Sequence, residues 1–336
     1  MKNTERFHRF FQGEISIDRT PVIEWAMWWD KTVNNWHNEG LPRSLTEITD
    51  ICDFWGQDQQ KQFWFAPYDE DFPKNPDDGK PASLVKNEED YAKVKKYLYT
   101  DRTLEKVYQE IKTFLKAKDG EDYAVWYSLE GFFWLPRVLF GIEDHLYAFF
   151  DYPDLMEEIN RDLADYYQKV LDAVYSLLKP QFMTFLEDMS YNHGPMLSKA
   201  HYDALIHPFY RELIPVIKGR GTRVFIDTDG FVEPLIPWFL ESGIEGILPL
   251  ERMAGVNVGR IRENFPALFM IGGFDKTVMH KGEQAMRAEF ERILPVIKSG
   301  RYIPSVDHQT PPDVDMQNYR VFMDLLFEYS GKIGKS

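Results

Sequence analysis

The sequence is short of cysteine and of positive charge. Cys52 is the only cysteine among 336 residues, which excludes an internal disulfide and a thiolate-rich metal cage. Lysine and arginine together number 39 against 54 aspartates and glutamates, which gives a formal net charge of -15. The chain therefore lacks the excess of basic residues that is typical of nucleic-acid-binding proteins. We interpret the negative charge as a surface charge that favours solubility.

Long apolar runs are also missing. The chain contains no run of 18 apolar residues, and its first residues, MKNTERFHRFFQGE, lack the apolar stretch of a signal peptide. We therefore expect a cytoplasmic protein with neither a membrane nor a nucleic acid as partner. The chain also lacks a G-x-S-x-G elbow and a Walker loop, which excludes those nucleophile and phosphate sites.

The sequence does contain short apolar runs separated by segments of helical length, clearest in residues 222–273. Such runs are typical of parallel strands joined by helices. Residues 154–178, by contrast, repeat apolar residues every three or four positions, as one face of a helix does. The candidate strands are PVIEWAMWW, KQFWFA, YAVWYSLEG, QFMTFLED, TRVFIDTDG, IEGILPLE, ALFMIGG and RYIPSVDH.

Eight strands alternating with helices predict an α/β fold, a (β/α)8 TIM barrel, as one domain over residues 1–336. We expect this domain to carry an N-terminal helical and aromatic extension. A loop insertion is predicted near residues 65–83, which are dense in proline, aspartate and glycine. A doubly wound open sheet is the alternative, and it is disfavoured because no G-x-G-x-x-G follows a strand.

Polar residues follow several of these runs, at the edge where loops of a barrel converge. Asp227 and Asp229 are two positions apart, so on an extended chain both side chains point to one side. Glu251 ends the next run, and His308 follows the last one. One histidine with two carboxylates would form a three-ligand zinc site with an open position. The alternatives are that an aspartate caps the next helix and that Glu251 pairs with Arg252.

The fourth candidate strand ends in FLEDMSYNHG. From this stretch we select Glu187 and His193 as residues of the pocket, with Tyr191 in the same loop. We also expect Asp307 to orient the ring of its neighbour His308.

Several stretches resemble the uroporphyrinogen decarboxylase superfamily, and together they cover nearly the whole chain. A single (β/α)8 barrel is what this resemblance implies. The stretches are RFHRFFQGEISIDRTPVIEW, NEGLP, YNHGPMLSKAHYDALIHPFYREL, DTDG, GILPLE, MIGGFDK and DHQTPPDVDMQNYRVFMDLL.

The superfamily includes two main chemistries. True porphyrinogen decarboxylases carry an R-Q-A-G-R-Y segment and an F-S-D-I segment, and neither is present here. The other branch consists of zinc-binding, corrinoid-dependent methyltransferases, some of which carry H-x-C after the fifth strand and a cysteine in the eighth-strand loop. Asp227 and Asp229 fall at the H-x-C positions, and His308 falls at or beside the final cysteine. Oxygen and nitrogen ligands in place of sulfur leave a harder ion, suited to polarising an ether oxygen.

The resemblance therefore implies a methyltransferase of the O-demethylating type. It would move a methyl group from a methoxylated aromatic small molecule to a corrinoid (cobalamin) carried by a partner protein. Asp229, Glu251 and His308 would hold Zn²⁺. Asp227 would be a catalytic residue, a fourth ligand, or a residue that contacts the ligands without binding the ion.

We expect further residues around this site. Tyr191 or His193 would contact the substrate oxygen or donate a proton. Trp25, Trp28 and Trp29, from a region that holds six of the nine tryptophans, would contact an aromatic ring together with Glu187. Ordinary core packing is the alternative for each tryptophan.

Other functions stay open at this point. A metal-free decarboxylase or lyase could use the same groups as acid and base, and a non-catalytic ligand-binding barrel would use them only for recognition. A homodimer is compatible with the sequence, although a dimer that covers the barrel mouth would block the corrinoid partner.

Overall fold

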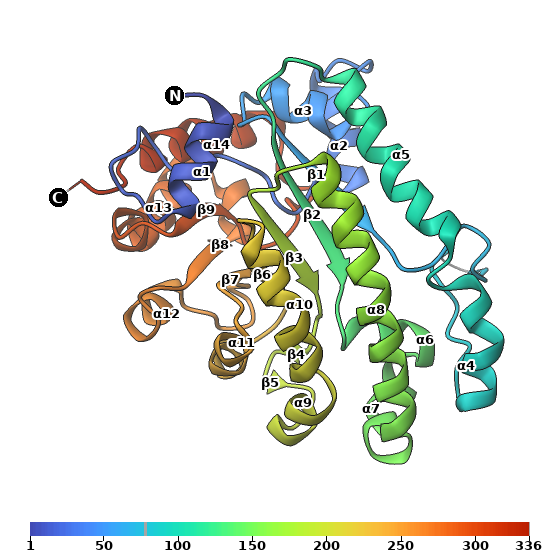
Figure 1. Cartoon of the computed structure of the whole chain (residues 1–336). Helices are drawn as coiled ribbons and strands as arrows, with labels where there is room; N and C mark the ends of the chain where they lie inside the picture. The colour runs from blue at the N-terminus through green and yellow to red at the C-terminus, as the bar shows by residue number, and fades with distance from the viewer. Residues whose placement is uncertain (77–78, 336) are drawn as a thin grey trace.

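Seven strands form one parallel sheet in the computed structural model, which describes residues 1–76 and 79–335. The strand order is β1-β2-β3-β6-β7-β8-β9, as Figure 1 shows. Seven of the eight predicted strands are thereby confirmed. Their bounds are β1 Gln60–Phe65, β2 Ala124–Glu130, β3 Phe182–Leu186, β6 Arg223–Asp227, β7 Gly246–Leu248, β8 Phe269–Phe274 and β9 Tyr302–Val306. A separate antiparallel hairpin pairs β4 Ser190–Tyr191 with β5 Gly194–Pro195.

The first predicted strand, residues 21–29, is wrong. The segment forms no strand ladder and bends at Trp25 and Ala26, and helix α2 begins at Asp30. Side chains of both edge strands hold it instead. The Gln60 amide of β1 donates to the Glu24 carbonyl at 3.1 Å, and the Ser305 hydroxyl of β9 donates to the Ile23 carbonyl at 3.0 Å. The sheet is therefore curled so far that its two edges meet the same short segment.

Helices cover the outer face of this curled sheet (Figure 1). The helix predicted at residues 154–178 is confirmed as α8, which starts at Pro153, where a missing backbone N–H costs nothing. The helices are α1 Asn3–Phe11, α2 Asp30–Glu39, α3 Ile48–Phe54, α4 Glu88–Val94, α5 Asp101–Ala117, α6 Trp134–Phe140, α7 Ile142–Asp151, α8 Pro153–Leu177, α9 Lys199–Leu205, α10 His207–Gly219, α11 Ile236–Ser242, α12 Val258–Asn264, α13 Glu283–Lys298 and α14 Met316–Ser330, with 3-10 turns at Lys95–Tyr97, Glu233–Leu235 and Lys276–Lys281.

A second, smaller core fills the inside of the curl. Helix α1 closes its amino-terminal end, because the Phe11 ring packs against Phe182, Phe225 and Phe269 at centroid distances of 5.2, 5.9 and 5.8 Å. Phe182 and Phe269 are the first residues of their strands. The amino-terminal end is therefore packed with aromatic rings, which leaves the carboxyl ends of the strands for a site.

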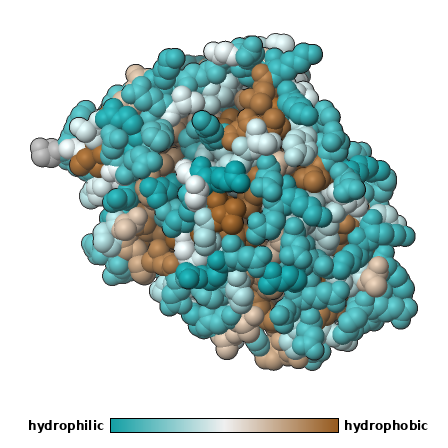
Figure 2. All heavy atoms as spheres, in the orientation of Figure 1, coloured by the Kyte–Doolittle hydropathy of each residue, from teal (hydrophilic) through white to brown (hydrophobic). Residues whose placement is uncertain are grey.

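The loop insertion predicted near residues 65–83 lies between β1 and α4, and two of its residues, 77 and 78, are outside the described residues. Over the part of the chain that the structure describes, no helix has the length and apolar character needed to span a bilayer. Figure 2 shows a mostly hydrophilic face with separate apolar patches, in keeping with the high content of charged residues.

Candidate functional site

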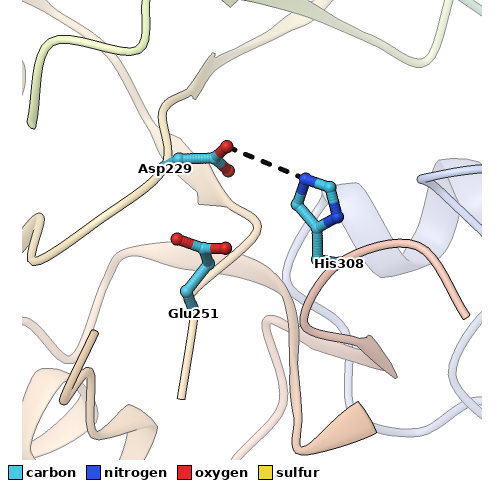
Figure 3. A group of neighbouring side chains, drawn as sticks. All are labelled: Asp229, Glu251 and His308. Carbon is cyan, nitrogen blue, oxygen red and sulfur yellow. Dashed lines mark ion pairs between the residues drawn. The ribbon is translucent and has the colours of Figure 1, made fainter. Parts of the chain in front are cut away.

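Three side chains from three different strand ends come together at the carboxyl edge of the sheet. Asp229 follows β6, Glu251 follows β7 and His308 follows β9. One ligand atom from each lies within 4.8 Å of the other two, and Figure 3 shows the three side chains facing a common space. The His308 Nε2 atom is 3.7 Å from the Asp229 Oδ2 atom. Residues nearly 80 positions apart in the chain are thus brought within reach of a single ion.

Neighbouring loops fix the backbone that carries these three side chains. The Gly230 N–H donates to the Glu251 carboxylate at 2.9 Å, which ties the loop after β6 to the loop after β7. Gly230 has a φ of +82°, and a Cβ there would lie 2.8 Å from the Tyr191 backbone. Only glycine allows the hairpin β4–β5 to pack this closely on the loop that carries Asp229.

His308 is held from the other side by Trp25. The Trp25 indole N–H donates to the Val306 carbonyl at 2.7 Å, and its ring meets the His308 ring edge-on at a centroid distance of 6.3 Å. The segment that was predicted as the first strand therefore supplies one wall of the site.

The electrostatics of the cluster favour a bound cation. Burial, together with the neighbouring carboxylates of Asp188 and Glu251, raises the pKa of Asp229 to about 7. Burial also raises the pKa of Asp227 well above its usual range, with Asp188 and Asp229 adding to the effect. The pKa of His308 is lowered by burial and then by the charge of Lys276. Crowded carboxylates beside a neutral imidazole are a set of donors that a divalent ion would stabilise.

A cavity of about 430 Å³ opens onto this cluster. Its walls combine aromatic and acidic side chains, and Trp25, Asp227, Asp229 and His308 are among them. The other lining residues are Ala26, Met27, Gln62, Trp64, Leu186, Asp188 and Gln309.

The structure corrects the placement of two predicted ring-contacting residues. Trp28 is buried and packs edge-on against Trp36 and Tyr319, at centroid distances of 5.6 and 6.0 Å. Trp29 is 48% exposed at the start of α2. Neither lines the cavity, because the chain turns away from the site after Trp25 to begin α2. The structure thus shows core packing for Trp28, which was the alternative interpretation of this residue.

Glu187 is also placed differently from the prediction. Its side chain is fully buried and accepts hydrogen bonds from the backbone N–H groups of Phe132, Phe133 and Trp134 and from the Tyr210 hydroxyl. It therefore clamps the turn between β2 and α6 and does not line the cavity.

The residue that sequence reasoning missed is Asp188. Leu186 and Asp188 line the cavity and Glu187 does not. Asp188 lies beyond the end of β3 at Leu186, and its φ of +43° turns the chain out of the extended conformation. The Asp188 Oδ1 atom also accepts from the Asp229 N–H at 3.3 Å. The two-residue period of a strand could not have identified it, because Asp188 lies outside the strand.

Tyr191 and His193 lie on the exposed hairpin β4–β5, with their rings edge-on at 5.6 Å. Neither lines the cavity. Asp307 does not bond the His308 ring as predicted. Its carboxylate instead accepts from the backbone N–H of Arg252 at 2.9 Å and of Lys276 at 3.2 Å. Asp307 therefore fixes the loop that carries Glu251.

A parallel α/β sheet with titratable side chains gathered at its carboxyl edge has the layout of an α/β-barrel enzyme. Comparison with known families agrees with this class. The family model of uroporphyrinogen decarboxylase (URO-D) matches residues 75–329, and the chain belongs to this family.

The matches among solved structures have low sequence identity. A methyltransferase from Methanosarcina mazei is 13% identical with a TM-score of 0.69, and the match covers 98% of this chain and 99% of that one. A candidate vitamin-B12-independent methionine synthase from Listeria monocytogenes is 13% identical with a TM-score of 0.48, covering 93% and 97% of the two chains. Among curated proteins, none has a matching sequence.

Proposed function

We propose that this protein is a zinc-dependent methyltransferase that moves a methyl group from a methoxylated aromatic molecule to a corrinoid on a separate protein. The observation that carries the proposal is the meeting of Asp229, Glu251 and His308 within 4.8 Å beside a cavity. Membership of the URO-D family and the fold shared with the Methanosarcina mazei methyltransferase support it. In this proposal the chain acts as one unit, and residues 21–25 complete an eight-membered barrel.

The donor set fits zinc in kind and in spacing. Zinc binds imidazole nitrogen and carboxylate oxygen at about 2.0–2.2 Å in a tetrahedral arrangement, so two ligand atoms on one ion are about 3.3–3.6 Å apart. The His308 and Asp229 atoms are already 3.7 Å apart. Three protein ligands would leave a fourth position for substrate. When bound, zinc would supply Lewis-acid stabilisation of the negative charge that develops on the ether oxygen.

The chain's own residues would bind and orient the substrate. The Trp25 ring forms an apolar wall beside His308, on which an aromatic ring can lie. Asp227 lines the same cavity, so its carboxyl group can hold the proton that the departing oxygen takes up. The hydrogen bond from Trp25 to Val306 keeps this wall in a fixed orientation relative to His308.

The same walls disfavour porphyrinogen decarboxylation. That substrate carries many carboxylates, whereas the cavity presents the carboxyl groups of Asp188, Asp227 and Asp229. Bringing like charges together in a partly buried site is unfavourable. The acidic lining therefore favours a substrate without several negative charges.

The test is metal content combined with methyl transfer. We expect the purified protein to hold one equivalent of zinc, and the Asp229→Ala and His308→Ala variants to lose it. The control His193→Ala removes an exposed histidine of the neighbouring hairpin and should keep the metal.

Methyl transfer would be followed as loss of the cob(I)alamin absorption band with a panel of methoxylated phenols. Turnover without zinc would favour a metal-free lyase and contradict the proposal. Binding of the phenols with zinc present but without turnover would favour a ligand-binding barrel instead.

A further inference from the structure

A second cavity, of about 650 Å³, adjoins the one beside the metal cluster. The two cavities share the side chains of Trp64 and Leu186 as a common wall. The second cavity is otherwise bounded by the loop after β1, the end of β2 and helix α6, and Tyr68, Glu130 and Arg137 are among its lining residues. A ligand that lies against Trp64 can therefore place substituents in both cavities.

Trp64 occupies the position that a stacking surface would need. It lies near the end of β1, two residues after Gln62, which also lines the first cavity. Its side chain is 44% exposed, whereas tryptophan is on average a highly buried residue type. A rigid ring left open between two cavities offers a large flat contact area at a low entropic cost.

Glu130 supplies an unsatisfied acceptor in the second cavity. Its side chain is 2% exposed, and its Oε1 atom accepts from the Tyr68 hydroxyl at 2.7 Å. Within the described residues, its Oε2 atom is buried and has no hydrogen-bond partner. Burial raises the pKa of Glu130 to about 7, against the effect of the Tyr68 hydrogen bond. A buried acceptor left without a partner is unfavourable, and a ligand that donates to it would remove that cost.

We propose that Trp64 is the stacking surface for an aromatic ring with two substituents. The methoxy group lies in the first cavity beside Asp229 and His308, and a hydroxyl group lies in the second cavity and donates to Glu130. The assignment of the methoxy group rests on the proposed function. The requirement for a second, hydrogen-bond-donating substituent goes beyond it and defines methoxyphenols as the substrate class.

A carboxylate in the second cavity is the competing substituent, because Arg137 also lines it. The Arg137 guanidinium already lies 5.1 Å from the Trp134 ring centroid and donates to the Asp188 carbonyl at 3.0 Å. A ring carboxylate would also face the buried carboxyl group of Glu130. The hydroxyl group is therefore the better match to this cavity.

Calorimetric binding to the full chain tests the inference without any methyl transfer. The probes are the methoxyphenol isomers, anisole and methoxybenzoate. We expect at least one methoxyphenol to bind the unaltered protein about tenfold more tightly than anisole, because one charge-assisted hydrogen bond corresponds to about that factor. Since this comparison uses only the unaltered protein, it does not depend on how any variant folds.

Two variants and two matched controls complete the test. Glu130→Gln should remove the tenfold preference for methoxyphenol, while Glu143→Gln, the same change at an exposed residue of the same cavity, should not. Trp64→Leu should weaken binding of both methoxyphenol and anisole about tenfold, whereas Trp29→Leu, at a similarly exposed tryptophan outside both cavities, should leave binding unchanged.

Any of several results would overturn the inference. These are no methoxyphenol binding at millimolar concentration, equal binding of anisole, tighter binding of methoxybenzoate, or a folded Glu130→Gln variant that keeps the preference. If the binding contrasts hold and no methyl transfer is found, the proposed function fails alone. If transfer occurs and the contrasts are absent, only this inference fails.

Discussion

The clamp at Glu187 gives a demanding test, because an isosteric change should be costly there. Glu187 Oε1 accepts from the Phe132 N–H at 2.9 Å and from the Tyr210 hydroxyl. Its Oε2 accepts from the N–H groups of Phe133 and Trp134 at 2.8 and 2.9 Å. Glu187→Gln keeps the shape of the side chain but replaces one of these acceptor oxygens by an NH₂ group, which can only donate.

The expected loss can be worked from these contacts. Whichever way the amide is turned, two buried donors lose their acceptor, and each unsatisfied donor costs about 1–3 kcal/mol. The gross cost is thus about 2–6 kcal/mol. Burial raises the pKa of Glu187 to about 7, so removing the charge recovers part of this cost. We expect a net loss of about 2–4 kcal/mol in the free energy of unfolding, a large fraction of the total for a typical protein.

Urea unfolding followed by tryptophan fluorescence would measure this loss. The control is Glu143→Gln, an identical change at an exposed residue, which should stay within about 0.5 kcal/mol of the unaltered protein. Gly131→Ala gives an independent check, because a Cβ there would lie 2.1 Å from the Glu187 Cδ atom and must displace the same carboxylate. A Glu187→Gln variant within about 1 kcal/mol of the unaltered protein would refute the clamp.

Three further predictions follow from the corrected placements. Trp28→Ala should lower the free energy of unfolding by about 3–5 kcal/mol and Trp29→Ala by no more than about 0.5, measured by urea unfolding; equal losses would contradict the burial of Trp28. Burial raises the pKa of Glu24 to about 8, so the folded state binds its proton more tightly than the unfolded chain. The stability that this group contributes is therefore lost as pH rises from about 4.5 to about 8, by roughly 4–5 kcal/mol. The stability of Glu24→Gln relative to the unaltered protein should therefore rise over this pH range. Thermal unfolding at pH 5.5 and 8.5 would measure it, and a stability difference that is the same at both pH values would oppose this prediction. Asp307→Asn should weaken zinc binding about 10- to 100-fold in chelator competition, because it loosens the loop that carries Glu251, and an unchanged affinity would argue against that role.

The strands could be predicted because parallel strands covered on both faces form short, mostly apolar runs. The meeting of Asp229, Glu251 and His308 could be predicted for a related reason, since every parallel strand delivers its carboxyl end to the same edge. Both predictions depend only on the position of a residue along its own strand, and such positions can be read from the sequence.

The predictions that failed depend on which way a side chain points or on what another segment supplies. Glu187 and Asp188 are adjacent acidic residues, and it is Asp188 that lines the cavity. The turn after β3, where Asp188 has a φ of +43°, decides this, and no strand periodicity extends that far. Trp28 and Trp64 are both aromatic residues near the N-terminus, but Trp28 packs on Tyr319, almost 300 residues later in the chain. Contacts between segments so far apart are set by the folded arrangement and leave no local pattern.

The segment that was wrongly predicted as the first strand still contributes to the site. Residues 21–25 have the apolar composition of a strand, and they lie where a strand would, between β1 and β9. Their backbone is held by side chains, including Asp58, whose carboxylate accepts from the Val22 N–H at 2.8 Å. No ladder fixes this segment, and one of the bonds that hold it is donated by the Trp25 indole N–H to the Val306 carbonyl, two residues before His308. The departure from regular strand pairing is thus what places an aromatic ring against the candidate zinc ligand.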